Sequence, residues 1–114
     1  MKQSDKERLK KIVSIWDKLK KQMEEREISA DQLLNDEFSQ WAVTTPLYNI
    51  GEHVYQLTDE FKRKYPEQPW SMVAGLRHRL VHDYEGTNWS IIVEVVFDDM
   101  EPFVESIKSI LKEM

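Results

Sequence analysis

The chain has 114 residues, a formal net charge of −5 and no cysteine. This length suits one domain, residues 1–114, whose single core would gain buried area from self-association, and the absence of cysteine excludes disulfides, thiolate metal sites and a cysteine nucleophile. The negative charge excludes binding of nucleic acid over the whole surface, because such binding needs Lys and Arg to neutralise phosphates, so any such contact must be local.

The N-terminal residues 1–6 are polar, so they lack the apolar segment of a signal peptide. No stretch of the chain reaches the roughly 18 uninterrupted apolar residues that a membrane-spanning helix needs. We therefore expect a soluble, cytoplasmic protein that makes no contact with membranes.

The sequence predicts an all-α fold, because only three glycines and four prolines interrupt it. Residues 4–26 form an amphipathic helix in this prediction, since apolar residues recur there at steps of three and four. A second helix starts at Ser29 or Asp31, either of which can cap it, and extends to about Phe61. Pro46 lacks a backbone donor and should kink or split this helix.

The segment from Tyr65 to Pro69 is a tight connector to a short helix over residues 70–81. Residues 83–88 end that helix, and Asn88 can cap a last helix that continues to Leu111. The β-branched run 91–97 is also compatible with a strand. A helix is preferred, because a lone strand would have no sheet to join and the helical period continues beyond the run.

The chemistry of the chain is concentrated between Arg77 and Tyr84. On one straight helix His82 would point roughly 140° away from Arg77, so the two converge only if the helix ends near His82 or if two copies meet across a dimer axis. Such a pair suits cleavage of RNA by its own 2′-hydroxyl. His82 can transfer protons near neutral pH and Arg77 can balance charge on phosphate oxygens, with no metal required.

Several short motifs occur together between Trp41 and the C-terminus: Gly51-Glu52, Pro66, Trp70, Gly75-Leu76-Arg77, Leu80-Val81-His82-Asp83-Tyr84 and Pro102. In this combination the chain resembles the HepT-like toxins of the HEPN superfamily. The resemblance implies a homodimeric up-and-down bundle of four to five helices. It also implies an endoribonuclease that acts on RNA rather than DNA without metal or cofactor, and a minimal nucleotidyltransferase as antitoxin.

The same resemblance assigns catalytic roles to Arg77 and His82, and it makes Tyr84 the residue to which the partner transfers AMP. His78 stands where the family often has Asn, so it is a candidate to share or replace the role of His82. Asp83 and Glu52 are candidates for supporting roles. Glu52 is either a solvated helix charge or a buried partner of Arg77.

Other interpretations of these residues stay open. His82 also suits a helix C-terminus, where the dipole favours a cation, and Tyr84 also suits an interface. His78 and His82 are spaced as in zinc sites, with His53, Asp83 or Glu52 as a third ligand. The four tryptophans are predicted to be core or dimer contacts rather than platforms for bases.

A local phosphate-binding patch is predicted from five basic residues: Lys62, Arg63, Lys64, Arg77 and Arg79. The first three equally suit the C-terminal end of a helix without any ligand. The alternative to a ribonuclease is a non-catalytic helical partner that docks the nucleotidyltransferase and presents Tyr84. Cleavage of RNA separates these two hypotheses.

Overall fold

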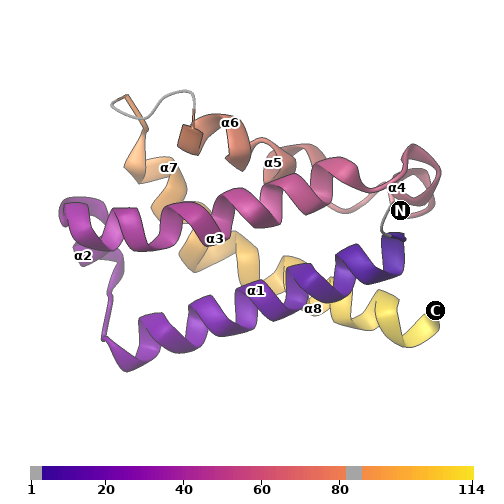
Figure 1. Ribbon diagram of the computed structural model, residues 1–114, viewed down its shortest axis with the longest axis horizontal. Helices are drawn as coiled ribbons and strands as arrows, with labels where there is room; N and C mark the ends of the chain where they lie inside the picture. The colour runs from indigo at the N-terminus through magenta and orange to yellow at the C-terminus, as the bar shows by residue number, and fades with distance from the viewer. Residues whose placement is uncertain (1–3, 82–85) are drawn as a thin grey trace.

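The computed structural model describes residues 4–81 and 86–114, and the residues described form helices and no strands, which confirms the all-α prediction. Two long helices, α1 (Asp5–Glu25) and α3 (Glu37–Gln56), pack against each other along much of their length (Figure 1). The C-terminal helix α8 (Met100–Glu113) packs against α1. These three helices form the frame of the bundle.

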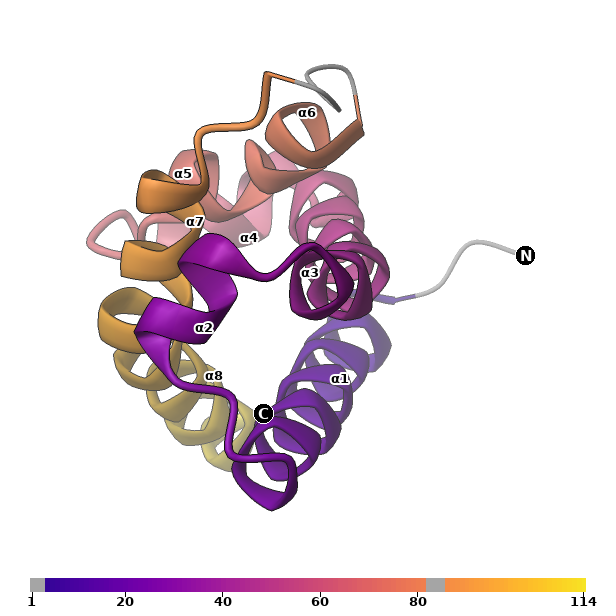
Figure 2. The ribbon, with the colours of Figure 1, turned by 90° about the vertical axis from the view of Figure 1, so that its left-hand side faces the viewer.

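The shorter helices complete the bundle around α3. The helices α5 (Trp70–Ala74) and α6 (Leu76–Val81) lie on the other side of α3 from α1 (Figures 1 and 2). At one end α2 (Ala30–Asn35) contacts both α3 and α7 (Trp89–Glu94), and Figure 2 shows it crossing that end. The remaining helix, α4 (Asp59–Lys64), connects the far end of α3 to α5.

The described residues contain more helical segments than the four to five expected, because the predicted second helix is divided at its caps. Asp36 starts α3 by accepting hydrogen bonds from the backbone N (2.9 Å) and the hydroxyl (2.7 Å) of Ser39. Thr58 starts α4 by accepting from the backbone N of Phe61. Ser29, one of the two predicted caps, starts α2.

Of the two outcomes predicted at Pro46, a kink or a split, the split is wrong, since α3 continues through this residue. A proline inside a helix costs about 3 kcal/mol. Val43, Leu47 and Ile50 surround it in sequence and are fully buried. Each such side chain contributes roughly 1.5–3 kcal/mol by leaving water, which outweighs the lost hydrogen bond.

The last helical run begins at Asn88, whose side chain accepts from the backbone N of Ser90, as the cap prediction required. The β-branched run is helical, which confirms the preference for helix over strand. Between α7 and α8 the backbone forms a wider π turn, η1 (Val95–Asp99). Pro102 follows this turn. In a regular α-helix the Pro102 ring would clash with the carbonyl of Asp98, four residues earlier, and the wider turn is compatible with the proline.

The core is a single cluster of apolar side chains drawn from all the helices. Trp16 and Trp70 belong to it, as predicted, whereas Trp41 on α3 is 53% exposed. In the part of the chain that the structure describes, no helix is both long and apolar enough to cross a membrane.

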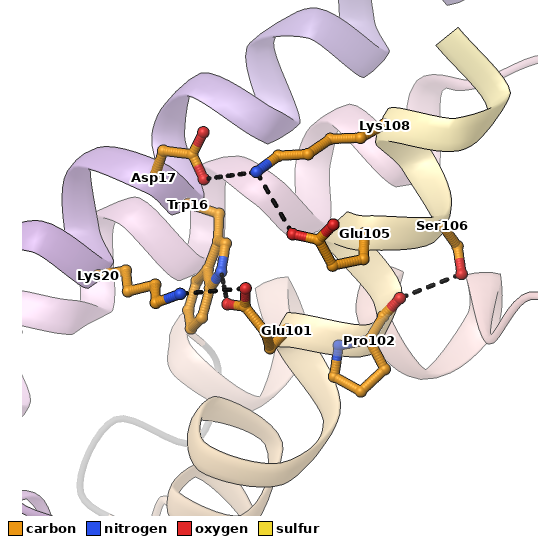
Figure 3. A network of polar contacts seen from close by, with 8 residues as sticks. All are labelled: Trp16, Asp17, Lys20, Glu101, Pro102, Glu105, Ser106 and Lys108. Atoms are coloured by element: carbon orange, nitrogen blue, oxygen red, sulfur yellow. Dashed lines mark hydrogen bonds and ion pairs between the residues drawn. The ribbon is translucent and has the colours of Figure 1, made fainter. Parts of the chain in front are cut away.

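A polar network joins α1 to α8 beside this core (Figure 3). The indole N–H of Trp16 donates to Glu101 Oε2 (3.0 Å), and Lys20 Nζ lies 3.0 Å from Glu101 Oε1. Lys108 Nζ bridges Asp17 (3.4 Å) and Glu105 (3.5 Å). The hydrogen bond from Trp16, followed by that from Lys20, lowers the pKa of Glu101 below its ordinary value.

Replacing Glu101 with Ala should lower the free energy of unfolding by about 1–2 kcal/mol, because the buried indole N–H of Trp16 loses its acceptor. The pKa of Glu101 is lowered in the folded state, so the part of this contribution that depends on the carboxylate charge is present above the ordinary carboxyl pKa and is lost as the pH falls through the folded pKa. The neutral carboxyl still accepts a hydrogen bond from the indole. The difference in Tm between wild type and variant should therefore be largest at neutral pH and smaller in acid. Glu105→Ala removes only an exposed contact and is the control; an equal loss of Tm in both variants contradicts the prediction.

Candidate functional site

Arg77 lies near the start of α6, where this helix packs on α3, and its side chain is 21% exposed. The guanidinium carbon lies 3.5 Å from the centre of the Tyr55 ring, which is a cation–π contact. Arg77 Nη1 lies 3.8 Å from Glu52 Oε2. Glu52 was interpreted either as a solvated helix charge or as a buried partner of Arg77. In the structure it forms an ion pair with Arg77 and is partly exposed.

Glu52 and Tyr55 reach Arg77 together because residues three apart share one face of a helix. Tyr55 was not among the site residues predicted from sequence. The available signal was its spacing from Glu52 on a helix, but only the packing of α6 on α3 shows that this face meets Arg77. A ring and a carboxylate therefore fix the plane of the Arg77 side chain from two directions.

Gly51 allows the two helices to approach this closely. A Cβ atom added to Gly51 would lie 3.1 Å from the backbone N of Arg77 and 3.1 Å from the backbone O of Val73. Both neighbours are backbone atoms of the segment that carries Arg77, so they cannot rotate away as a side chain can. The absence of a side chain at Gly51 is therefore part of how Arg77 is positioned.

A pocket of about 330 Å³ opens beside Arg77. Its lining residues come from α3, α4, α5 and α6 and the link between the last two: Tyr55, Lys62, Trp70, Ser71, Ala74, Gly75, Arg77 and His78. The structure thus brings together Lys62, Arg77 and His78 from the residues predicted from sequence. Arg63, Lys64 and Arg79 are exposed and are not among the lining residues.

The buried Nε atom of Arg77 has no hydrogen-bond partner among the described residues. The distance to Glu52 exceeds that of a hydrogen bond. Glu52 therefore orients the guanidinium electrostatically without occupying its N–H donors.

The other predicted site residues fall in two groups. His82, Asp83 and Tyr84 lie outside the described residues. His53 lies on α3 with its Nδ1 atom 3.2 Å from Arg8 Nη1. Burial, and then the positive charges of Arg8 and Lys11, lower the pKa of His53, which favours the neutral ring, whose Nδ1 can accept from Arg8.

The described ranges 4–81 and 86–114 contain no group of three His, Asp or Glu side chains that could hold the zinc ion of the alternative interpretation. Two of its proposed ligands, His82 and Asp83, are not in these ranges.

The model of the ribonuclease HepT-like family matches residues 6–110, so the chain belongs to this family. This confirms the resemblance seen in the short motifs. The match includes α3, α5 and α6, the helices that form the site around Arg77.

Curated relatives agree with the family. A protein of Methanocaldococcus jannaschii named "putative RNase" is 36% identical over 88 residues, which are 77% of this chain and 73% of the relative. Another with that description, from Caldanaerobacter subterraneus subsp. tengcongensis, is 34% identical over 85 residues, 75% of this chain and 76% of the relative. A "probable ribonuclease HepT" of Thermococcus cleftensis is 36% identical over 75 residues, 66% and 68% of the two chains. No solved structure matches.

Proposed function

We propose that this protein is a cytoplasmic ribonuclease toxin that cleaves RNA without a metal. The 2′ oxygen of the strand bonds to the adjacent phosphorus as the bond to the 5′ oxygen breaks, leaving a 2′,3′-cyclic phosphate and a 5′-hydroxyl. The 2′-hydroxyl proton passes to a base, and a proton reaches the departing oxygen. His82 is the proposed proton carrier, and Arg77 balances charge on the phosphate oxygens.

The observation that carries this proposal is the way Arg77 is held. Its guanidinium is placed over Tyr55 at 3.5 Å and next to Glu52 at 3.8 Å, beside an open pocket. A planar cation fixed before the substrate arrives loses less entropy and reorganises less when charge develops on a phosphate. The ribonuclease names of the relatives support the same chemistry.

The test is incubation of the purified, unmodified protein with single-stranded RNA in EDTA. Cleavage that ends in a cyclic phosphate supports the proposal. Intact RNA with the wild-type protein contradicts it and favours the non-catalytic partner instead.

Regulation by a minimal nucleotidyltransferase antitoxin is the second part of the proposal. The phenol oxygen of Tyr84 attacks the α-phosphorus of ATP, and pyrophosphate leaves. Family membership and the position of Tyr84 in the Arg77–Tyr84 motif support it. With ATP and a minimal nucleotidyltransferase of the antitoxin type, the wild-type mass should rise by one AMP unit while Tyr84→Phe stays unchanged; an unchanged wild-type mass contradicts it.

The active form in this proposal is a homodimer. Two large aromatic side chains on the first half of α3, Phe38 and Trp41, are 74% and 53% exposed, and a second copy would cover such area. Light scattering should give the mass of two chains for the wild type and of one for Trp41→Asp. A monomeric wild type contradicts this part of the proposal.

A further inference from the structure

The pocket beside Arg77 is lined by basic side chains in an acidic protein. Lys62 comes from α4, and Arg77 and His78 come from α6, whereas no carboxylate is among the lining residues. The whole chain has 21 acidic and 16 basic residues, so this local excess of positive charge is opposite to the overall balance. Glu52 forms an ion pair with Arg77, and no ion pair between Glu52 and Lys62 occurs in the described part of the chain.

Lys62 is a cation of this pocket that keeps donors for a ligand. Its Nζ atom donates to the backbone O of Tyr55 at 3.4 Å, and in the described part of the chain it forms no ion pair with a carboxylate. An ammonium group has three N–H donors, so one carbonyl leaves two for a ligand. The carbonyl of Tyr55 thus holds the amine beside the pocket without neutralising it.

Of the aromatic residues of the pocket, Trp70 offers no free face to a base, and Tyr55, which is 51% exposed, offers one face at most. Trp70 is 7% exposed, and its indole N–H donates to the backbone O of Tyr65 at 2.9 Å. One face of Tyr55 is occupied by the Arg77 guanidinium. With three basic side chains and at most one ring face, the pocket suits contact with phosphates through charge and hydrogen bonds more than stacking of bases.

The size of the pocket agrees with such a ligand. A volume of about 330 Å³ lies at the lower end of the range for small-ligand sites, enough for one phosphate with its sugar. Gly75 lines the pocket without a side chain, and Ser71 adds a hydroxyl. Arg77 belongs both to this pocket and to the proposed cleavage site, so the two are contiguous.

We propose that this pocket is a subsite for a phosphate of the RNA strand next to the phosphate that is cleaved, with Lys62 as its main ligand. This inference rests on the proposed ribonuclease function, and it specifies where the RNA strand binds next to the cleavage site. Because the subsite contacts the backbone alone, it accepts any base at that position.

The experiment measures binding of a labelled RNA oligonucleotide whose 2′-hydroxyls are all methylated, so that it keeps its phosphates and cannot be cleaved. Fluorescence anisotropy is recorded at several salt concentrations for wild type, Lys62→Gln and Lys62→Arg. Lys62→Gln should weaken binding roughly three- to tenfold at low salt. Its slope of log affinity against log salt should be shallower by about 0.7, the value for one phosphate of a single strand. Lys62→Arg, which keeps the charge, should restore the wild-type slope.

The matched control is Lys112→Gln, which removes the same charge from the last turn of another helix, α8. Equal losses in Lys62→Gln and Lys112→Gln would mean general attraction and overturn the subsite, as would a wild-type protein that does not bind the oligonucleotide. ATP carries the same phosphate chemistry and is titrated separately as a competitor of the labelled RNA. If ATP displaces the labelled RNA at lower concentrations than unlabelled RNA does, the pocket binds a nucleotide rather than an RNA strand, and the proposal is wrong.

Cleavage of unmodified RNA is measured in parallel. A wild type that binds the methylated RNA through Lys62 yet cleaves nothing would retain the subsite and reject the nuclease. Cleavage that is insensitive to Lys62→Gln, together with an unchanged salt slope, would support the nuclease and contradict the subsite.

Discussion

Replacing Arg77 with Ala should reduce the rate of RNA cleavage by about a hundredfold or more, the effect of removing one preorganised donor to a developing oxyanion. The guanidinium is the group that the structure fixes beside the pocket, with Tyr55 over its plane and Glu52 at its edge. Initial rates with labelled single-stranded RNA in EDTA measure the loss.

The loss should be chemical rather than structural. Glu52 is partly exposed, so water can solvate it once Arg77 is gone, and the variant also removes a buried Nε atom that lacks a partner. The free energy of unfolding of Arg77→Ala should therefore differ from that of the wild type by at most about 1 kcal/mol. Arg77→Lys keeps the charge but loses the planar fork and the stacking on Tyr55, so it should recover only part of the rate.

Arg79→Ala is the comparison on the same helix. Arg79 is exposed on α6 and does not line the pocket, so its replacement should change the rate by a few-fold at most, through general attraction of RNA. Wild-type rates in Arg77→Ala, or equal losses in the two variants, would remove Arg77 from the proposed mechanism.

Replacing Gly51 with Ala should destabilise the protein, although Ala inside a helix is ordinarily favoured over Gly by about 1 kcal/mol. The new methyl group would lie 3.1 Å from two backbone atoms, Arg77 N and Val73 O, so α5 and α6 must move away from α3. Overpacking of this kind typically costs 1–3 kcal/mol, which corresponds to a fall in Tm of about 5–15 °C for a chain of this size.

The same displacement moves Arg77 relative to Tyr55 and Glu52, so cleavage should fall even at temperatures where Gly51→Ala is fully folded. Asn49→Ala is the control, since Asn49 is exposed on the same helix and Ala suits that position. A higher Tm in Gly51→Ala than in wild type would show that the contact between α3 and α6 accommodates a methyl group, and would contradict the prediction.

The helical organisation could be predicted from local patterns because it depends on local interactions. The three- and four-residue spacing of Leu9, Ile12, Trp16 and Leu19 defines the buried face of α1, and Ser29 and Asn88 cap the helices that follow them. These features act within one or two helical turns. They require no knowledge of what packs against them.

Local reasoning failed where packing outweighs it. Pro46 was expected to kink or split its helix, and the split does not occur, because the burial of Val43, Leu47 and Ile50 keeps α3 continuous. The additional break at Asp36 depends on its two hydrogen bonds to Ser39, a cap that the apolar period does not reveal.

By itself the sequence determined the all-α class, the principal helices and the family, together with Arg77 as the residue to examine. Only the tertiary structure decided that Tyr55 and Glu52 hold Arg77, that Gly51 makes room for this contact, and that Lys62 reaches the same pocket. Helix period and capping follow from neighbours along the chain, whereas these contacts depend on how α3, α4 and α6 pack, and no spacing in the sequence encodes that distance.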